Sequence, residues 1–465
     1  MHEPPKSVLA VCLLLFPAVA PAADFQAGVA VVEITPPMAY RMSGYFRERL
    51  NTGTRDPLLA KAIVLRQGSV DAALVFCDLI GIAPQVSKDA RKLAEAKTGI
   101  PAANIAISAT HSHTGPLYFG ALREQFRQVA IEKFGRDPHE KEDYSKVLVG
   151  KLVEAIVKAK TSAAPVRLRH GVAEETRLSF NRRFHMKNGP VRFNPGQLNA
   201  NIIRPAGPID PDVGMLNFVT PGSGKSLALL VVFALHLDTV GGTEYSADYP
   251  KYLSDALQKK LGAHTVSMFG AGTCGDINHI DVSIRGRRSS EEIGGMLAGT
   301  VKSLLPRLQT TESPSLAVAR EVVAAPLQQY SASQIVEARD NMKLIGSRKL
   351  SFLEQVESYK ITALQMRGSD VLPIEVQAFR LSSNVAVVTL PGEVFVELGL
   401  AIKLASPFET TLVIELTNDA PGYIPTRKAF AEGSYETVNS HTAAGGGEKM
   451  VAAAIRLLEK LKRGA

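Results

Sequence analysis

Two histidines spaced two residues apart are the first feature of the sequence that could do chemistry. His111 and His113 lie in N-I-A-I-S-A-T-H-S-H-T-G-P, the stretch from Asn104 to Pro116. The alternating Ile105 and Ile107 predict a buried strand before them, and Gly-Pro ends the segment. On an extended chain, side chains two residues apart point to the same side, so we expect both imidazoles to face one point. The pair is a candidate metal site; the alternative is one structural and one surface histidine.

Other polar residues are predicted at the ends of further strands. The apolar run L-A-L-L-V-V-F-A-L-H, residues 227–236, predicts a central strand that ends in His236. Asp276 and Asn278 follow a predicted strand at 266–269, and Glu393 follows a predicted hairpin in P-G-E. Ligands and catalytic groups collect at strand ends in α/β proteins. A histidine such as His236 can also be purely structural.

Two histidines, a carboxylate and an open position form a catalytic zinc arrangement, which lowers the pKa of bound water to about 7. The sequence contains no H-E-x-x-H, no G-x-S-x-G and no P-loop motif. G-S-G-K-S at 222–226 lacks the P-loop spacing and predicts a turn. The sequence therefore contains none of these motifs for other metal-dependent, serine-hydrolase or nucleotide-binding sites.

Composition describes a globular protein of one large domain or two ordinary ones. The 465 residues are 45% hydrophobic and 21% charged, with a formal charge of +8. Lys and Arg are scattered and no nucleic-acid-binding motif is present, so we expect no nucleic-acid partner. The positive charge allows weak contact with an anionic membrane surface. Trp is absent and other aromatic residues are few, which does not favour an aromatic-lined carbohydrate groove.

The N-terminal residues predict export. Lys6 precedes an apolar run at 8–20, and Ala20-Pro21-Ala22 is a small-x-small cleavage pattern. Residues 1–22 are therefore interpreted as a secretory signal peptide, which gives a periplasmic or secreted protein. A retained membrane anchor is the alternative.

Two cysteines remain after the predicted cleavage. Cys77 and Cys274 could pair, or could be small buried residues near the site, because both lie beside acidic motifs. Two cysteines exclude a structural Cys-rich zinc site.

Strands and helices alternate along the chain, which predicts an α/β fold with mixed β-sheets flanked by helices. No linker is visible, so we expect one large domain over 23–465. The segments at 178–195 and 418–435 are expected to be loops. Further strands are expected at 28–35, 60–65, 72–76, 167–173, 372–381, 385–390 and 411–416, and helices at 85–97, 144–160, 247–261, 331–346, 352–367, 394–404 and 447–462. Ser289 to Glu292 resembles a capping box that opens a helix to about Leu305.

Taken in order, the motifs resemble those of the neutral/alkaline non-lysosomal ceramidase family. They are G-V-A-V-V-E-I-T-P-P, M-S-G-Y, A-T-H-S-H-T-G-P, F-N-R-R, F-A-L-H, G-D-I-N-H, L-P-G-E and G-Y-I-P. The resemblance covers nearly the whole predicted mature chain and corresponds to the family's N-terminal catalytic domain, without the immunoglobulin-like C-terminal domain of longer members.

The resemblance implies one zinc ion. His113 and Arg182, the arginine of N-R, are implied to hold the substrate carbonyl or its developing oxyanion. Tyr435 is a second choice for the tyrosine ligand. The implied zinc ligands are His111, His236, Glu393 and Tyr423.

One residue departs from the family pattern. The family's nucleophilic serine lies in G-D-x-S-P-N, and Asn278 stands in its place. Water activated by the metal could attack directly while Asn278 donates a hydrogen bond, Thr273 could replace the serine, or hydrolysis could be lost. We favour the first. Asp276 is expected to orient its neighbours, and His279 to be a general base or a packed histidine.

These observations favour an exported zinc-dependent hydrolase of the neutral ceramidase type. It would cleave an amide in an N-acyl-sphingosine-like lipid or another small molecule, a role in lipid and sphingolipid metabolism. Alternatives are a family member that binds lipid or sugar without hydrolysis, and a metal-dependent hydrolase of an ester or lactone. The predicted ligand set has too few carboxylates for a two-metal phosphoesterase.

Overall fold

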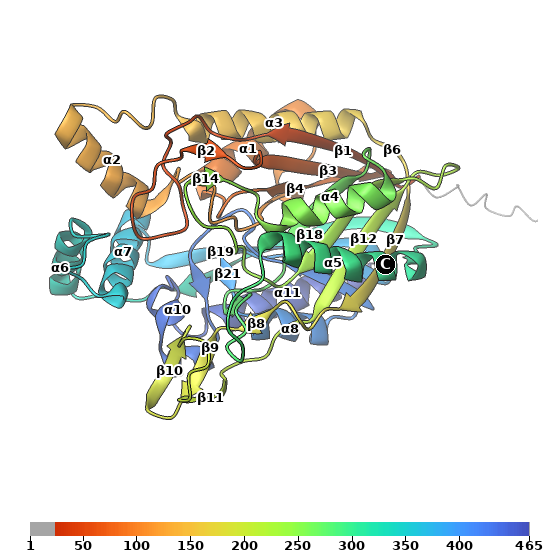
Figure 1. The fold of residues 1–465 in the computed structure, drawn as a ribbon. Helices are drawn as coiled ribbons and strands as arrows, with labels where there is room; N and C mark the ends of the chain where they lie inside the picture. The colour runs from red at the N-terminus through yellow and green to blue at the C-terminus, as the bar shows by residue number, and fades with distance from the viewer. Residues whose placement is uncertain (1–23, 465) are drawn as a thin grey trace, which may run out of the picture.

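Three β-sheets share one hydrophobic core in the structure, a computed structural model that describes residues 24–464 (Figure 1). The first sheet has the order β5-β4-β3-β1-β6, the second β15-β13-β12-β7-β17 and the third β18-β19-β20-β22. Leu74, Leu230 and Val387, one from each sheet, are fully buried in that shared core. The expected α/β fold with mixed sheets is confirmed. The predicted signal peptide lies outside the described residues.

The strand bounds of the three sheets are as follows. The first contains β1 (Gln26–Glu33), β3 (Leu59–Gln67), β4 (Val70–Cys77), β5 (Ile105–Ala109) and β6 (Ala164–Pro165). The second contains β7 (Arg167–Glu174), β12 (Asp212–Val219), β13 (Ser226–Phe233), β15 (Val266–Ala271) and β17 (Gln309–Thr310). The third contains β18 (Pro314–Pro326), β19 (Val371–Ser382), β20 (Val385–Thr389) and β22 (Thr410–Ile414).

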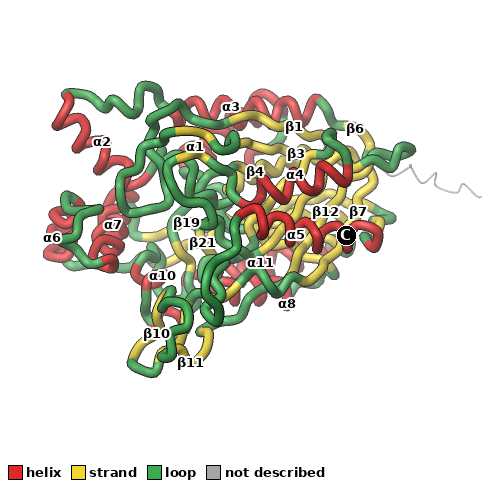
Figure 2. The backbone as a smooth tube through the Cα atoms, in the orientation of Figure 1, coloured by secondary structure: helices red, strands yellow, loops and turns green. Residues whose placement is uncertain are grey.

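Helices cover the outer faces of these sheets, and Figure 2 shows them around the strands. The first sheet is covered by α3 (Tyr144–Thr161), with α1 (Pro84–Thr98) beside it; the second by α4 (Tyr249–Leu261) and α5 (Ser290–Leu304); the third by α8 (Val396–Ala405) and α11 (Gly446–Arg463). A separate group contains α2 (Gly120–Phe134), α6 (Ala332–Met342), α7 (Phe352–Arg367) and α10 (Tyr435–Val438).

Short elements complete the fold. A small sheet of β9 (Arg183–Met186), β10 (Gly189–Phe193) and β11 (Ile202–Pro205) projects at the bottom of Figure 1. Three two-stranded pairs are β2 (Gly53–Thr54) with β14 (Glu244–Tyr245), β8 (Phe180–Asn181) with β16 (Ile277–Asn278), and β21 (Glu393–Val394) with β23 (Tyr423–Ile424). The remaining helices are η1 (Ala102–Asn104), η2 (Leu305–Arg307) and α9 (Arg427–Glu432).

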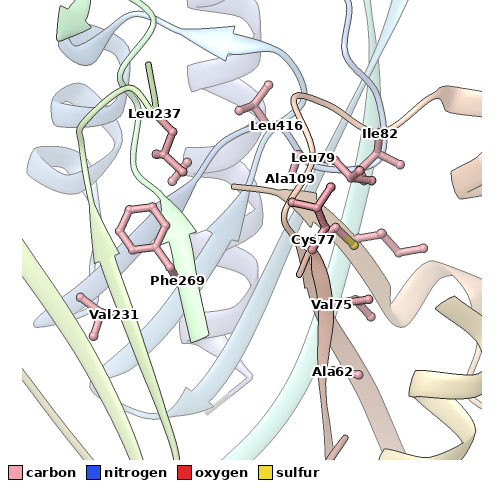
Figure 3. Packing of buried hydrophobic residues seen from close by; sticks show 14 of the residues in the cluster. Ala62, Val75, Cys77, Leu79, Ile82, Ala109, Val231, Leu237, Phe269 and Leu416 are labelled. Atoms are coloured by element: carbon pink, nitrogen blue, oxygen red, sulfur yellow. The ribbon is translucent and has the colours of Figure 1, made fainter. Parts of the chain in front are cut away.

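The carboxyl ends of three parallel strand pairs meet at one place. The pairs are β4-β5, β13-β15 and β20-β22. Backbone hydrogen bonds join them: Ala109 N donates to Leu416 O at 3.0 Å, and Glu415 N donates to Ala271 O at 2.9 Å. Figure 3 shows apolar side chains of these segments, Ala109, Leu237 and Leu416 among them, in the core beside this junction. Segments far apart in sequence are therefore fixed against one another where their strands end.

Most expected elements are confirmed, and local chemistry explains their ends. The expected helix 352–367 is α7, whose N-cap Ser351 forms a capping box with Glu354. The capping box expected at Ser289 is also present, and it begins α5. The expected hairpin is the antiparallel pair β19-β20, and residues 222–226 form the predicted turn.

Several expectations are wrong. Segment 178–195 contains β8, β9 and β10, because short strands pair there with distant ones. Segment 418–435 contains β23 and α9. The helix expected from 247 begins at Tyr249, because Asp248 with φ 60° is its N-cap. The strand expected to run to His236 ends at Phe233.

Within residues 24–464, no helix is long and apolar enough to cross a membrane.

Cys77 and Cys274 are both buried and unpaired, which confirms that they are small buried residues. The Cys274 thiol donates to Glu415 Oε1 at 3.1 Å.

Candidate metal centre and adjoining cavity

Three imidazoles meet at the junction of the sheets. His111 Nε2 lies 2.9 Å from His236 Nε2 and 3.2 Å from His113 Nε2. The ligand-capable atoms of the three residues all lie within 4.8 Å of one another, and His111 and His236 are buried. The predicted convergence of His111, His113 and His236 is therefore observed.

The backbone at His111 is what brings its ring to this point. The strand ends at Ala109, and His111 has φ 80°, a left-handed conformation rare for a side chain of this size. Its N–H donates to Leu79 O at 2.9 Å, which stabilises the turn. The expected extended chain across His111 and His113 is wrong, although both rings do face one point. Such a conformation costs about 1–3 kcal/mol and is typical of functional sites.

The orientation of two rings follows from their second nitrogens. His111 Nδ1 lies 2.7 Å from the carbonyl oxygen of Ile80, and His236 Nδ1 lies 3.4 Å from that of Cys274. In the tautomer with the proton on Nδ1, each ring donates to its carbonyl oxygen. The lone pair of Nε2 then points to the place where the three rings meet. Burial lowers the pKa of His236 well below its usual value, so its ring stays neutral.

Glu393 brings a carboxylate to the same point. Its Oε2 lies 3.3 Å from His111 Nε2 and 3.8 Å from His236 Nε2. Within the described chain this buried oxygen has no hydrogen-bond donor. Glu393 pairs with Tyr423 in the parallel β21-β23 bridge. The Tyr423 hydroxyl donates to the Tyr435 hydroxyl at 3.5 Å.

These residues fit a divalent cation. Neighbouring ligand atoms around a tetrahedral zinc with bonds of about 2.1 Å lie about 3.4 Å apart, close to the distances between His111, His236 and Glu393. Two imidazole lone pairs and an orphaned buried carboxylate oxygen repel one another unless a cation lies between them. Tyr423 and His113 are both placed to complete the set.

Arg182 lies beside this set and is held rigidly. Its Nε donates to Glu436 Oε1 at 3.0 Å and its Nη2 to Gly275 O at 2.7 Å. The guanidinium carbon lies 5.4 Å from the ring centroid of Tyr423 and 6.0 Å from that of Tyr435. Within the described residues its Nη1 makes no hydrogen bond. A positive charge with one free donor is therefore fixed next to the candidate metal centre.

His113 is fixed by residues that the sequence did not mark. Arg49 Nη2 donates to the His113 carbonyl oxygen at 2.7 Å. His113 Nδ1 lies 3.8 Å from Asp238 Oδ1, which accepts a hydrogen bond from the Tyr45 hydroxyl at 2.8 Å. Burial lowers the pKa of His113 to about 4, so the ring is neutral.

Asp276 is buried and accepts hydrogen bonds from neighbouring segments of the chain. Its Oδ1 accepts from Val396 N and its Oδ2 from Asn181 Nδ2, both at 2.8 Å. Its carbonyl oxygen accepts from Arg182 N at 2.9 Å. Burial raises the pKa of Asp276 to about 6. Asp276 thus connects α8 and Arg182, the residue between β8 and β9.

Asn278 lines a cavity beside the candidate metal centre. Its Nδ2 donates to Asn194 Oδ1 at 2.8 Å and its Oδ1 accepts from Ile280 N at 3.0 Å. His279 also lines this cavity, whereas Thr273 does not. The Thr273 hydroxyl packs against α8, 2.0 Å from the position that a Cβ on Gly399 would occupy.

The cavity has a volume of about 440 Å³ and a strongly aromatic wall. His113, Arg182 and His236 form part of its floor, and loops 44–47, 278–287 and 346–355 surround it. An aromatic lining is the opposite of what the low aromatic content suggested, because those few rings are concentrated here. The lining rings are Tyr45, Phe46, Phe193, Phe352, Tyr423 and Tyr435.

The sequence analysis did not identify the buried carboxylates that hold the site residues in place. Glu436 is fully buried, and its two oxygens accept from Arg182 and Arg183. Glu415 is also fully buried and accepts from Val394 N at 2.6 Å and Cys274 N at 3.2 Å. A signal for Glu415 existed, since a carboxylate directly follows the apolar β22, but nothing in the local sequence marks Glu436.

Comparisons with known proteins agree with this geometry. Residues 25–248 match the family model for "Neutral/alkaline non-lysosomal ceramidase, N-terminal". A comparison with curated proteins finds no match.

Two solved structures have a similar fold. Neutral ceramidase from Pseudomonas aeruginosa is 18% identical with a TM-score of 0.72, over 95% of this chain and 75% of that one. A ceramidase complexed with C2 is 17% identical with a TM-score of 0.70, over 95% of this chain and 76% of that one. Residues 25–248 therefore match the N-terminal part of the neutral/alkaline non-lysosomal ceramidase family.

Proposed function

We propose that this protein is a zinc-dependent hydrolase that cleaves amide bonds in N-acyl compounds. The observation that carries the proposal is the convergence of His111 Nε2, His236 Nε2 and the Glu393 carboxylate beside a cavity. The family match supports the reaction class. The similar fold of a ceramidase complexed with C2 supports a substrate with an acyl chain.

In this proposal His111, His236, Glu393 and Tyr423 hold one zinc ion. A bound Zn²⁺ polarises the scissile carbonyl and lowers the pKa of a water molecule to about 7. The protein's own residues then stabilise the charge that develops on the substrate and orient the substrate. His113 and the free Nη1 of Arg182 lie where they can donate to the developing oxyanion.

The reaction balances without a protein nucleophile. The oxygen of water bonds to the carbonyl carbon, the C–N bond breaks, and the protons of water end on the amine and in solution. Asn278 has one Nδ2 hydrogen committed to Asn194 and a second that can bind substrate or water. This accounts for hydrolysis although the serine is absent.

The test is turnover of short-chain and long-chain N-acyl amides, with the matching esters and lactones as comparison. We expect amide hydrolysis that a chelator abolishes and added Zn²⁺ restores. A purified protein that holds zinc and hydrolyses only the esters or lactones would contradict the amide assignment. Turnover that survives complete removal of metal would contradict the metal assignment.

Asn278 favours a second candidate function, binding of a lipid or sugar ligand without hydrolysis. The two functions differ in how Asn278→Ser behaves. If the native protein is an active hydrolase, restoring the serine is not needed for turnover. If the native protein binds a short-chain ceramide without turnover and Asn278→Ser hydrolyses it, the binding function is correct.

Export is part of the proposal. A signal peptide at residues 1–22 would direct the enzyme to the periplasm or the exterior. N-terminal sequencing of the protein recovered outside the cytoplasm should begin near Ala23. Recovery of the uncleaved chain from the cytoplasm would contradict export.

A further inference from the structure

The cavity carries positive charge that no protein carboxylate neutralises. Arg47 and Arg287 both line it, and both side chains are exposed. Within residues 24–464 neither arginine takes part in an ion pair or a side-chain hydrogen bond. The Arg47 guanidinium carbon lies over the face of the Tyr45 ring, 5.6 Å from its centroid. By contrast, Arg182 on the cavity floor is paired with Glu436.

Asp238 is the one carboxylate among the cavity-lining residues of the described chain. It is already bound by the Tyr45 hydroxyl and faces His113. The positive charge of the two unpaired guanidinium groups therefore exceeds the negative charge that Asp238 supplies. A site lined in this way attracts and retains an anion.

His279 provides a buried polar atom on the same wall. Its side chain is only 6% exposed, it lines the cavity, and its Nδ1 has no hydrogen-bond partner in the described structure. Burial lowers the pKa of His279 to about 4, and the neighbouring Arg287 acts in the same direction. The neutral ring can thus donate one hydrogen bond to a ligand without adding charge. A buried nitrogen left unpaired is unfavourable, and a polar group of a ligand would satisfy it.

The rest of the wall is suited to an apolar chain. The rings of Phe46, Phe193 and Phe352 lie in the same cavity. A ligand that fills it should therefore combine an apolar portion with an anionic group. A neutral two-chain lipid supplies the first property and not the second.

We propose that the preferred substrate is an amide that carries a carboxylate close to the scissile bond, an N-acyl amino acid being the simplest example. This inference rests on the proposed amide hydrolysis. Arg287 and His279 bind the carboxylate, Arg47 attracts it at the rim, and the aromatic wall holds the apolar portion. The carboxylate can belong to the amine half or to the acyl half of the amide.

The experiment compares substrates that differ only in charge and dissolve as single molecules. N-hexanoylglycine and N-hexanoylethanolamine test a carboxylate on the amine half; N-butylsuccinamic acid and N-butylbutanamide test one on the acyl half. We expect kcat/KM to be at least about tenfold higher for the anionic member of one pair, the size of one charge-assisted contact. Equal values in both pairs would overturn the inference, while turnover of the neutral amides would leave the hydrolase itself intact.

Single-residue variants test which side chains cause the preference for the anionic amide. Arg287→Gln is expected to lower the ratio of anionic to neutral kcat/KM about tenfold, and His279→Phe to lower it less. Arg285→Gln is the matched control, because Arg285 is also exposed, lies two residues away and does not line the cavity. If Arg285→Gln lowers the ratio as much as Arg287→Gln, the anion is held by general surface charge and the inference fails.

Measurements of ligand binding test the inference even if the protein hydrolyses no amide. N-hexanoylglycine should bind the metal-loaded native protein at least about tenfold more tightly than it binds Arg287→Gln, measured by titration calorimetry. Equal affinities would overturn the carboxylate site. Absence of turnover with tight binding would contradict only the proposed hydrolysis.

Discussion

His111 Nε2 and His236 Nε2 face each other at 2.9 Å, although 125 positions separate them in the chain. One follows β5 in the first sheet and the other follows β13 in the second. Backbone hydrogen bonds between the strand ends fix this relationship before any ligand binds. Since both Nε2 atoms can direct lone pairs toward the same point, the fold prearranges two groups that could bind a cation.

His236 and His113 are expected to differ in their effect on the metal. His236→Gln should lose the ion, because His236 is buried and directs Nε2 at the centre. His113→Gln should retain the ion and lower kcat by about 100-fold, because it removes an oxyanion donor. Metal per chain, measured by mass spectrometry, together with turnover checks both. Loss of the ion from His113→Gln and its retention in His236→Gln would show that the roles are reversed.

Metal removal should lower stability, and Glu393 should determine by how much. With a chelator the Glu393 carboxylate stays buried without a partner cation, so the melting temperature should fall by several degrees. Glu393→Gln removes that charge, and its melting temperature should respond little to zinc or chelator. Calorimetric scans with and without chelator measure this. An equal response of native protein and variant would contradict a role for Glu393 as ligand.

Glu415 should act through position rather than charge. It joins the backbone of Val394, next to Glu393, to that of Cys274, whose carbonyl faces His236. Burial raises its pKa well above the usual value, so the neutral isostere Glu415→Gln should keep zinc affinity. Glu415→Leu should weaken zinc binding about 10–100-fold, as the loss of a group behind the ligands does. Competition with a chromophoric chelator gives both affinities, and similar values for the two variants would contradict this account.

Glu436 should be essential for stability. Its two oxygens accept from Arg182 Nε and Arg183 Nη1, both at 3.0 Å, and all three side chains are buried. Glu436→Gln would leave the buried guanidinium of Arg182 without its counter-charge and Arg183 with Glu432 alone, and should lower the free energy of unfolding by about 3–5 kcal/mol.

The matched control is Glu154→Gln, which breaks an exposed pair with Lys158 at 2.7 Å. It should change the free energy of unfolding by no more than about 0.5 kcal/mol. Urea unfolding measures both variants. Equal small effects would contradict a buried charge network at Glu436.

Lys360 should make stability depend on pH. Its side chain is 1% exposed and lies 3.9 Å from the Tyr330 ring centroid, and burial lowers its pKa to about 7. Because the folded pKa lies below the unfolded value, the unfolded chain binds more protons between about pH 7 and 10.5, and burying Lys360 costs most at or below pH 7. Lys360→Met should therefore increase the free energy of unfolding by about 1–3 kcal/mol at pH 6.5, and the gain should shrink towards pH 10.

Urea unfolding at several pH values checks this expectation. Lys349→Met, at an exposed position without an ion pair in the described structure, should show no such pH-dependent gain. A gain for Lys360→Met that stays constant with pH would show that packing, not charge, explains it.

Local sequence signals predicted part of this structure. Helix α7 was predictable to the residue because Ser351 and Glu354 form a capping box whose pattern is visible in four letters. The convergence of His111, His113 and His236 was predictable because these residues follow apolar strand runs and lie in ordered motifs. The end of β13 was misplaced, because Ala234 and Leu235 continue the apolar pattern although their backbone leaves the strand.

Other features depend on contacts that the sequence does not contain. β9 and β10 form because they pair with each other and with β11, which apolar periodicity does not reveal. The left-handed turn at His111 is fixed by the carbonyl of Leu79 on a neighbouring segment. Arg47, Arg287 and His279 come from two separate loops, and only the folded chain places them in one cavity.

Anomalous scattering at the zinc edge, from crystals of the purified protein, tests the central claim most directly. We expect one peak, about 2.0–2.2 Å from the Nε2 atoms of His111 and His236 and from the Glu393 carboxylate. A zinc-loaded crystal with no peak at this junction, or with zinc bound only elsewhere on the protein, would contradict the account.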